Sequence, residues 1–165
     1  PQCLGLEAQI GAPWADDRPR LVAKDELSRL IENDRPGLIA DLTRRRLVER
    51  EREQFSIKSP GLLRVALQLE AAGVDLDTAY EAAAMMRKHM VKASRELAKY
   101  FVKRASMGFG RDASGDEILE AFRAVRPLGL EALLLIFGQE MEKALAELLR
   151  EGPDRIMPPG KGDSG

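Results

Sequence analysis

The sequence predicts a mostly α-helical protein, with a small winged-helix-like unit followed by a helical bundle that contains one long helix. Three observations lead to this prediction. Apolar residues recur every three to four positions over most of the chain, which is the period of an amphipathic helix. Two short helical segments flank a turn-forming stretch, NDRPG, and a possible hairpin follows them. Behind Gly73, an apolar stripe keeps the helical period from Leu76 to Val102.

The composition limits the classes of protein to consider. The 165 residues suit one domain, or one domain with a small subdomain, and 44% of them are hydrophobic. The formal net charge of −1 provides no overall basic field for nucleic acid, so any basic contact must be local or lie on another segment. The apolar run LGLEALLLIF at 128–137 is too short to span a bilayer and carries Glu131, so we expect no membrane partner.

Cysteine usage and the chain ends give weaker indications. Cys3 is the only cysteine, which excludes an intrachain disulfide and favours a cytoplasmic location. The sequence begins without Met or a helix cap, and we interpret it as cut from a longer chain. The Gly- and Pro-rich end, residues 152–165, is predicted to be a flexible tail.

Residues 23–58 are predicted to form the winged-helix-like subdomain. A first helix at 23–33 places Leu27, Leu30 and Ile31 on one face, and a second at 35–48 starts at Pro36. Phe55 and Ile57 then alternate as in a strand, which indicates a hairpin, although its REREQ turn lacks glycine or asparagine.

Residues 59–151 are predicted to form a helical domain. A helix from Pro60 ends at Gly73, and Asp75 caps a long helix that runs to about residue 104. Ser114 caps a helix at 116–125, and Pro127 starts or kinks the last helix, to about residue 150. The first of these helices is expected to bury five apolar residues: Leu62, Leu63, Ala66, Leu67 and Leu69.

Catalytic chemistry has little support in the sequence. His89 is the only histidine, and no pattern pairs it with a nucleophile, so it is better interpreted as a surface or pocket-lining residue. One cysteine and one histidine give no metal-ligand cluster, and no phosphate-binding loop or dinucleotide motif is present. We therefore predict a protein that is not an enzyme and needs no metal or cofactor.

The basic cluster TRRRLVERER at 43–52 is the candidate for direct contact with DNA. Arg44, Arg45 and Arg46 follow the second short helix and are placed to meet phosphate. The alternative is a charged surface, because four acidic residues nearly cancel the cluster: Asp41, Glu49, Glu51 and Glu53.

Methionine and aromatic residues provide the candidates for a ligand site. The stretch AAAMMRKHM at 82–90 carries three methionines, whose flexible side chains suit promiscuous binding. The alternative is that these residues form core. The segment LLLIF at 133–137 lacks a polar side, so it is either fully buried or meets a partner chain. The candidate ligand-binding residues are Trp14, Tyr80, Met86, His89, Met90, Phe101, Phe122 and Phe137.

Three motifs in order carry a resemblance to a known family. They are LGLE with APW at 4–14, SPGLL with LEAAGVDLD at 59–77, and FRAVRPLGLEA at 122–132. Over residues 3–150, their order and spacing resemble the C-terminal part of actinobacterial MerR-type transcriptional regulators. The N-terminal DNA-reading segment of that family is absent, so residues 1–22 would be a linker from a missing DNA-binding domain.

The resemblance implies an effector-sensing part of a homodimeric regulator, in which residues 59–151 are the helical effector-binding and dimerisation domain. Such a protein contacts DNA through its N-terminal domain, can contact RNA polymerase, and couples a small ligand to promoter control. Cys3 alone does not match the metal-sensing branch, which needs several cysteines, so a small organic effector is the expectation. The effector residues of this family are diverse and none is transferred. The alternative is a helical dimerisation or interaction module that uses residues 128–149 and binds no small molecule.

Overall fold

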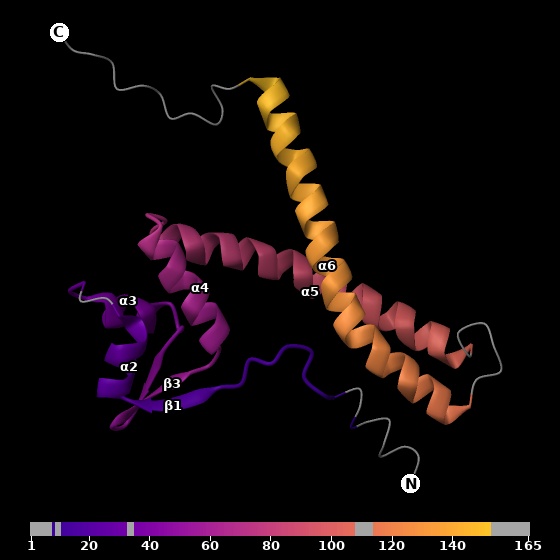
Figure 1. The fold of residues 1–165 in the computed structure, drawn as a ribbon, viewed down its shortest axis with the longest axis horizontal. Helices are drawn as coiled ribbons and strands as arrows, with labels where there is room; N and C mark the ends of the chain where they lie inside the picture. The colour runs from indigo at the N-terminus through magenta and orange to yellow at the C-terminus, as the bar shows by residue number, and fades with distance from the viewer. Residues whose placement is uncertain (1–7, 9–10, 33–34, 108–113, 153–165) are drawn as a thin grey trace. The chain divides into compact units, whose positions relative to one another are not determined.

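The computed structural model describes residues 8, 11–32, 35–107 and 114–152 (Figure 1). The described part confirms the mostly α-helical class, because five helices account for most of it and the three strands are short. The expectations for Cys3 and for most of the C-terminal tail lie outside the described residues.

Contacts divide the chain into two compact units, and each is described by itself. One unit comprises residues 15–107, and the other comprises residues 1–14 together with 108–165. The domain boundaries expected from the sequence stay predictions.

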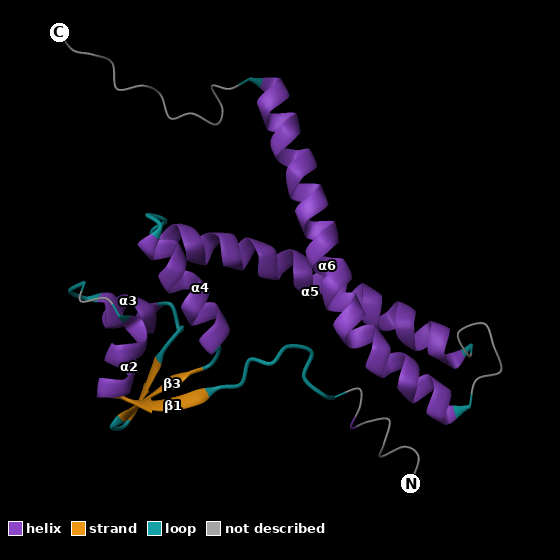
Figure 2. Cartoon of the chain, in the orientation of Figure 1, coloured by secondary structure: helices purple, strands orange, loops and turns teal. Residues whose placement is uncertain are grey.

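A three-stranded antiparallel sheet lies in the unit of residues 15–107 (Figure 2). It is formed by β1 (Arg20–Ala23), β2 (Glu49–Glu51) and β3 (Gln54–Ile57), in the order β1-β3-β2. The predicted hairpin is present as β2 and β3, and Phe55 in β3 pairs with Val22 on one side and Arg50 on the other. The sequence did not predict β1, which lies in the expected linker and pairs with a strand more than thirty positions away.

Two short helices separate β1 from the hairpin. They are α2 (Lys24–Ile31) and α3 (Leu38–Arg44). The prediction of one helix over 35–48 was wrong in extent, because α3 begins behind Gly37, whose φ of 81° is left-handed, and Arg46 (φ 57°) turns the chain toward β2.

The next two helices begin and end close to where the sequence placed them. Ser59 caps α4 (Pro60–Ala71), and its hydroxyl accepts a hydrogen bond from the backbone N–H of Leu62. Asp75 caps α5 (Leu76–Ser106) by accepting from the N–H of Thr78 at 2.8 Å. Between them, Gly73 (φ 91°) allows a tight reversal, and only Val74 and Asp75 lie between this glycine and α5.

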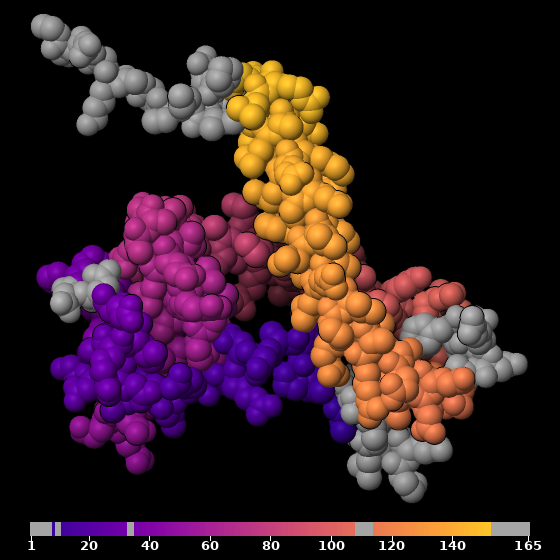
Figure 3. Space-filling view, viewed as in Figure 1, coloured from indigo at the N-terminus to yellow at the C-terminus, as the bar shows by residue number. Residues whose placement is uncertain are grey.

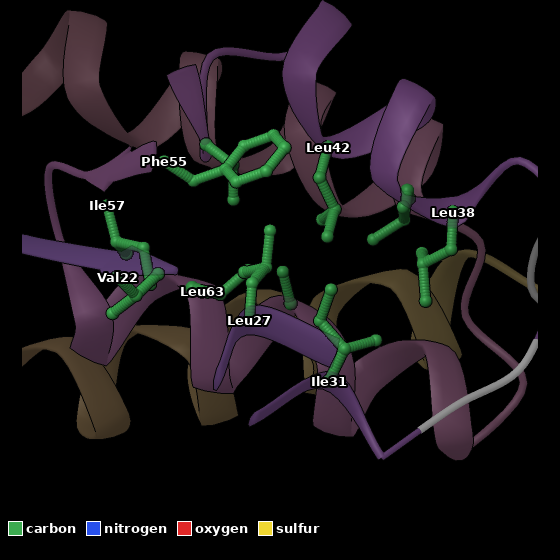
Figure 4. Packing of buried hydrophobic residues seen from close by; sticks show 11 residues of the cluster. Val22, Leu27, Ile31, Leu38, Leu42, Phe55, Ile57 and Leu63 are labelled. Carbon is green, nitrogen blue, oxygen red and sulfur yellow. The ribbon is translucent and has the colours of Figure 1, made fainter. Parts of the chain in front are cut away.

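The core of this unit joins the sheet to α2, α3, α4 and the start of α5. Figure 4 shows apolar side chains from these elements pointing toward one another, including Val22, Leu27 and Leu42. The inward placement expected for Leu30, Leu62 and Leu69 was wrong, since 43%, 46% and 36% of these residues are exposed. The buried residues are Val22, Leu27, Ile31, Leu38, Leu42, Val48, Phe55, Ile57, Leu63, Ala66 and Leu76.

The other unit is built around a single helix, α6 (Gly115–Glu151). Ser114 and Glu117 form a reciprocal capping box at its start. The expectation that Pro127 starts a new helix is corrected, because Pro127 lies inside one continuous helix, where it lacks an N–H for the helical hydrogen bond. The alternative, a kink at Pro127, stays a prediction. The Trp14 ring lies over Gly129, where an added Cβ would come within 3.4 Å of the ring.

Candidate functional site

A groove opens between α2 and α4, within the unit of residues 15–107. Its volume is about 810 Å³, which lies in the range of small-molecule sites. Its apolar lining comes from the end of α2, the end of β3 and one face of α4, and it includes Leu30, whose side chain is left exposed. The apolar lining residues are Leu30, Ile31, Ile57, Pro60, Leu63, Leu67 and Ala71.

Asp17 fixes one end of this groove to the start of α4. Its carboxylate accepts a hydrogen bond from the Ser59 hydroxyl and another from the backbone N–H of Gly61 at 2.8 Å. These two bonds lower the pKa of Asp17 below its ordinary value, and the nearby Arg64 charge adds to the effect. Gly61 lets the carboxylate approach closely, because an added Cβ would lie 3.1 Å from its oxygen and the side chain of Asp17 would have to shift slightly.

Charged groups of both signs surround the apolar lining. Arg20 is held in an ion pair with Glu26 at 2.9 Å, whereas Arg64 and Gln68 on α4 make no such contact within the described ranges. Asp16 and Glu32 add acidic groups. An apolar surface bordered by polar groups suits an amphipathic molecule better than a fully apolar or a highly charged one.

Arg45 connects the end of α3 to the start of α5. Its guanidinium pairs with the carboxylate of Asp77 and lies 5.9 Å from the centre of the Tyr80 ring. Only 9% of the Arg45 side chain is exposed, while 78% of the Asp77 side chain is. Arg45 therefore acts as a packed connection between two helices, which the sequence did not indicate.

Arg35 makes a second connection, from α3 to α4. Its guanidinium contacts Asp41 at 3.0 Å and Glu70 at 2.8 Å, and the carboxylates raise its pKa. Together with the Arg45 pair, this contact ties α3 to both helices that follow the sheet.

The predicted DNA-contact residues are therefore in different surroundings. Arg44 and Arg46 are exposed, and Arg44 contacts Asp41 at 3.2 Å. Arg45 is mostly buried in its pair with Asp77. Contact with DNA stays a prediction for all three, and the geometry favours Arg44 and Arg46 over Arg45.

The predicted ligand-binding residues fall in both units. Five lie on α5: Tyr80, Met86, His89, Met90 and Phe101. Tyr80 and Phe101 are 21 positions apart, or about 32 Å along a helix, so α5 alone does not gather them into one pocket. Trp14, Phe122 and Phe137 belong to the other unit. Their role in ligand binding stays a prediction, and the sequence analysis missed the α2–α4 groove.

The sequence pattern could not predict the groove because its lining residues come from separate elements. Leu30 and Leu67 are two groove residues that the apolar pattern does contain. They continue the helical apolar stripes, a pattern that is equally typical of core residues.

No protein-family model, no curated protein and no solved structure matches the chain. Within the described residues, no group of histidine, cysteine and carboxylate side chains is arranged to hold a metal ion. None of the described helices combines the length and the hydropathy that crossing a membrane requires.

Proposed function

We propose that this chain is the effector-sensing part of a homodimeric MerR-type transcriptional regulator, and that it binds a small organic molecule in the α2–α4 groove. The observation that carries the proposal is the position of the groove on α4, a helix that is separated by four residues from the start of the 31-residue helix α5. DNA contact through an N-terminal domain, and any contact with RNA polymerase, rest on the sequence resemblance.

The groove supports an apolar or amphipathic ligand. Leu30 and Leu67 offer apolar surface, while Arg64 and Gln68 are polar groups on α4 that a ligand can contact. Burying the exposed apolar part of these side chains provides affinity, and the polar groups orient the ligand.

Ligand binding has a short structural route to α5. A molecule bound between α2 and α4 favours one distance between these helices over others. The helix α4 is in turn joined to α5 by a tight turn. The Arg35 and Arg45 contacts join α4 and α5 to α3, so we expect a movement of α4 to affect the start of α5. A ligand that prefers one arrangement shifts the equilibrium toward it.

The finer description of the small unit as winged-helix-like is part of this proposal. Support comes from the order strand, helix, helix and hairpin over residues 20–57. The exposed Arg44 and Arg46 follow the second of these helices. A helix followed by an exposed basic turn favours a nucleic-acid contact, which would supplement the N-terminal domain.

A thermal-shift screen with matched ligands tests the sensing proposal. Octanoate, octylamine and 1-octanol share an alkyl body and differ only in their polar group. We expect a saturable rise in Tm with at least one of them, because the ligand binds the folded state. Leu30→Glu should abolish the rise, since it places a charge on the apolar lining.

The matched control is Leu69→Glu, which changes another exposed leucine of the same unit that does not line the groove. It should retain the ligand response. No response to any of the three probes in the unaltered chain, or equal responses in both variants, would exclude the groove as the effector site.

A further inference from the structure

The last two thirds of α6, from Leu128, carry an apolar surface that the described residues of its own unit leave exposed. The helix has 37 residues, and none of them is buried. Leu134 is the most exposed of its large apolar residues, at 76%. Figure 3 shows the orange-to-yellow part of α6 with side chains at the surface on the face in view. The exposed large apolar residues of this part are Leu128, Leu130, Leu133, Leu134, Leu135, Ile136, Phe137, Met141, Leu145, Leu148 and Leu149.

A seam can be identified within this surface. Apolar residues recur at alternating intervals of four and three, the spacing of two helices that wind around each other. The seam extends about 27 Å along the helix. It consists of Leu130, Leu134, Phe137, Met141, Ala144 and Leu148.

The outer side of the same segment is polar over its second half. Gln139, Lys143 and Arg150 lie off the seam, and Lys143 contacts Glu140 at 2.7 Å. The outer side is not polar throughout, because three exposed apolar residues also lie off the seam: Leu135, Ile136 and Leu149. The spacing of the seam, rather than a fully polar opposite side, is what suits it to one helical partner.

Two glycines inside α6 differ in their surroundings. Gly129 is covered by the Trp14 ring, whereas an added Cβ at Gly138 would meet nothing within 4 Å. A glycine inside a helix costs about 1 kcal/mol relative to alanine. Gly138 directly follows the seam residue Phe137 and has no side chain. It therefore leaves a notch at the edge of the seam into which a side chain of a second helix can insert.

We propose that α6 pairs with α6 of a second copy of this chain along the seam of residues 130–148. A second copy is the occupant that the surface fits, because it supplies both the large side chain Phe137 and the notch at Gly138 in a self-complementary contact. Residues 128–151 carry five glutamates against one lysine and one arginine, which disfavours nucleic acid.

The size of the surface is sufficient for a specific pair. Seven large residues on or beside the seam can each bury on the order of 60–120 Å² of apolar surface. The resulting area, on the order of 400–800 Å² per copy, reaches the range of specific interfaces. This inference gives the homodimer of the proposed function a defined contact surface. Its test uses no ligand, so either proposal can fail alone.

Sedimentation velocity over a range of concentrations tests the pairing on the full chain. We expect a dimer that dissociates on dilution, and Leu134→Glu should raise its Kd by about 100-fold or more because it places a charge on the seam. The matched control is Ala146→Glu, which adds the same charge to the same helix on the side away from the seam. It should leave Kd unchanged.

Gly138→Leu tests the notch without adding charge. It raises helix propensity, so circular dichroism should show equal or greater helicity while Kd rises at least tenfold. A monomer at all concentrations, or a dimer that withstands both Leu134→Glu and Gly138→Leu, would overturn the proposal.

A distance measurement separates pairing through α6 from pairing elsewhere. Spin labels on Gln139→Cys in a Cys3→Ser background should lie roughly 10–25 Å apart in the dimer, because packed helix axes are about 8–10 Å apart. Labels separated by more than about twice that distance would show that another surface forms the dimer.

Discussion

The guanidinium of Arg45, at the end of α3, pairs with the carboxylate of Asp77 in the first turn of α5. The pair lies beside the Tyr80 ring, and it connects the small sheet-containing part of the unit to the long helix. An arginine that the sequence placed among candidate DNA contacts thus has a structural partner. In the proposed function, this pair determines how the start of α5 follows α3 and α4.

Breaking this pair should loosen α5 at its start. We expect Asp77→Asn to lower the free energy of unfolding by about 1 kcal/mol, because one partner is exposed and the other is packed. A double-mutant cycle with Arg45→Met isolates the interaction energy. As a control, the changes in unfolding free energy of Asp77→Asn and Arg87→Ala, far along α5, should add. If the changes of Asp77→Asn and Arg45→Met also add, the pair contributes nothing to stability.

The buried core residues that stabilise this unit come from its sheet and from each of its helices. Leu42 is fully buried between α2, α3 and the sheet, so Leu42→Ala should destabilise by about 2–5 kcal/mol through lost burial and a cavity. Leu30→Ala, at an exposed position, should cost less than about 1 kcal/mol. Urea unfolding followed by circular dichroism measures both, and equal losses would contradict the core assignment.

The Asp17 carboxylate should make stability depend on pH. Its hydrogen bonds to Ser59 and Gly61 lower its pKa, so its contribution is present above about pH 4 and is lost as the pH falls through the lowered pKa. Asp17→Asn should therefore flatten the fall in Tm below pH 4. Asp16→Asn serves as control, since Asp16 makes no hydrogen bond within the described ranges. Parallel Tm profiles for the two variants would rule out this role.

Direct DNA contact, if present, should depend on Arg44 and Arg46 rather than on Arg45. Binding of the chain to duplex DNA should weaken steeply with salt, and each lost phosphate contact should reduce the slope of log K against log salt by about 0.9. Arg44→Ala and Arg46→Ala are each expected to reduce this slope by that amount. The comparison variant is Lys103→Ala, a basic residue at the far end of α5. An absence of binding at low salt would remove this unit as a DNA contact.

Several elements could be predicted because local signals in the sequence agree with the packing. Asp75 and Ser59 are capping residues placed directly before apolar periodic runs, and α5 and α4 begin behind them. The alternation of Phe55 and Ile57 predicted a strand, and both side chains are buried.

Other features depend on contacts that no local pattern contains. The four residues of β1 become a strand only because β3 lies beside them, and Arg52 adopts a left-handed φ of 56° in the hairpin turn without glycine or asparagine. Helical spacing alone could not separate Leu27, which is buried, from Leu30, which borders the groove. The groove is formed by α2, β3 and α4 together, so sequence spacing could not locate it.

Backbone amide NMR of the full chain, titrated with octanoate, octylamine and 1-octanol, tests the central claim most directly. The account predicts saturable shifts at α4 residues such as Arg64, Leu67 and Gln68, and smaller shifts at Leu76 to Tyr80 at the start of α5. The shifts at α5 should shrink in Asp77→Asn while those at α4 remain. Shifts confined to α6, or no saturable shifts with any of the three probes, would contradict the account.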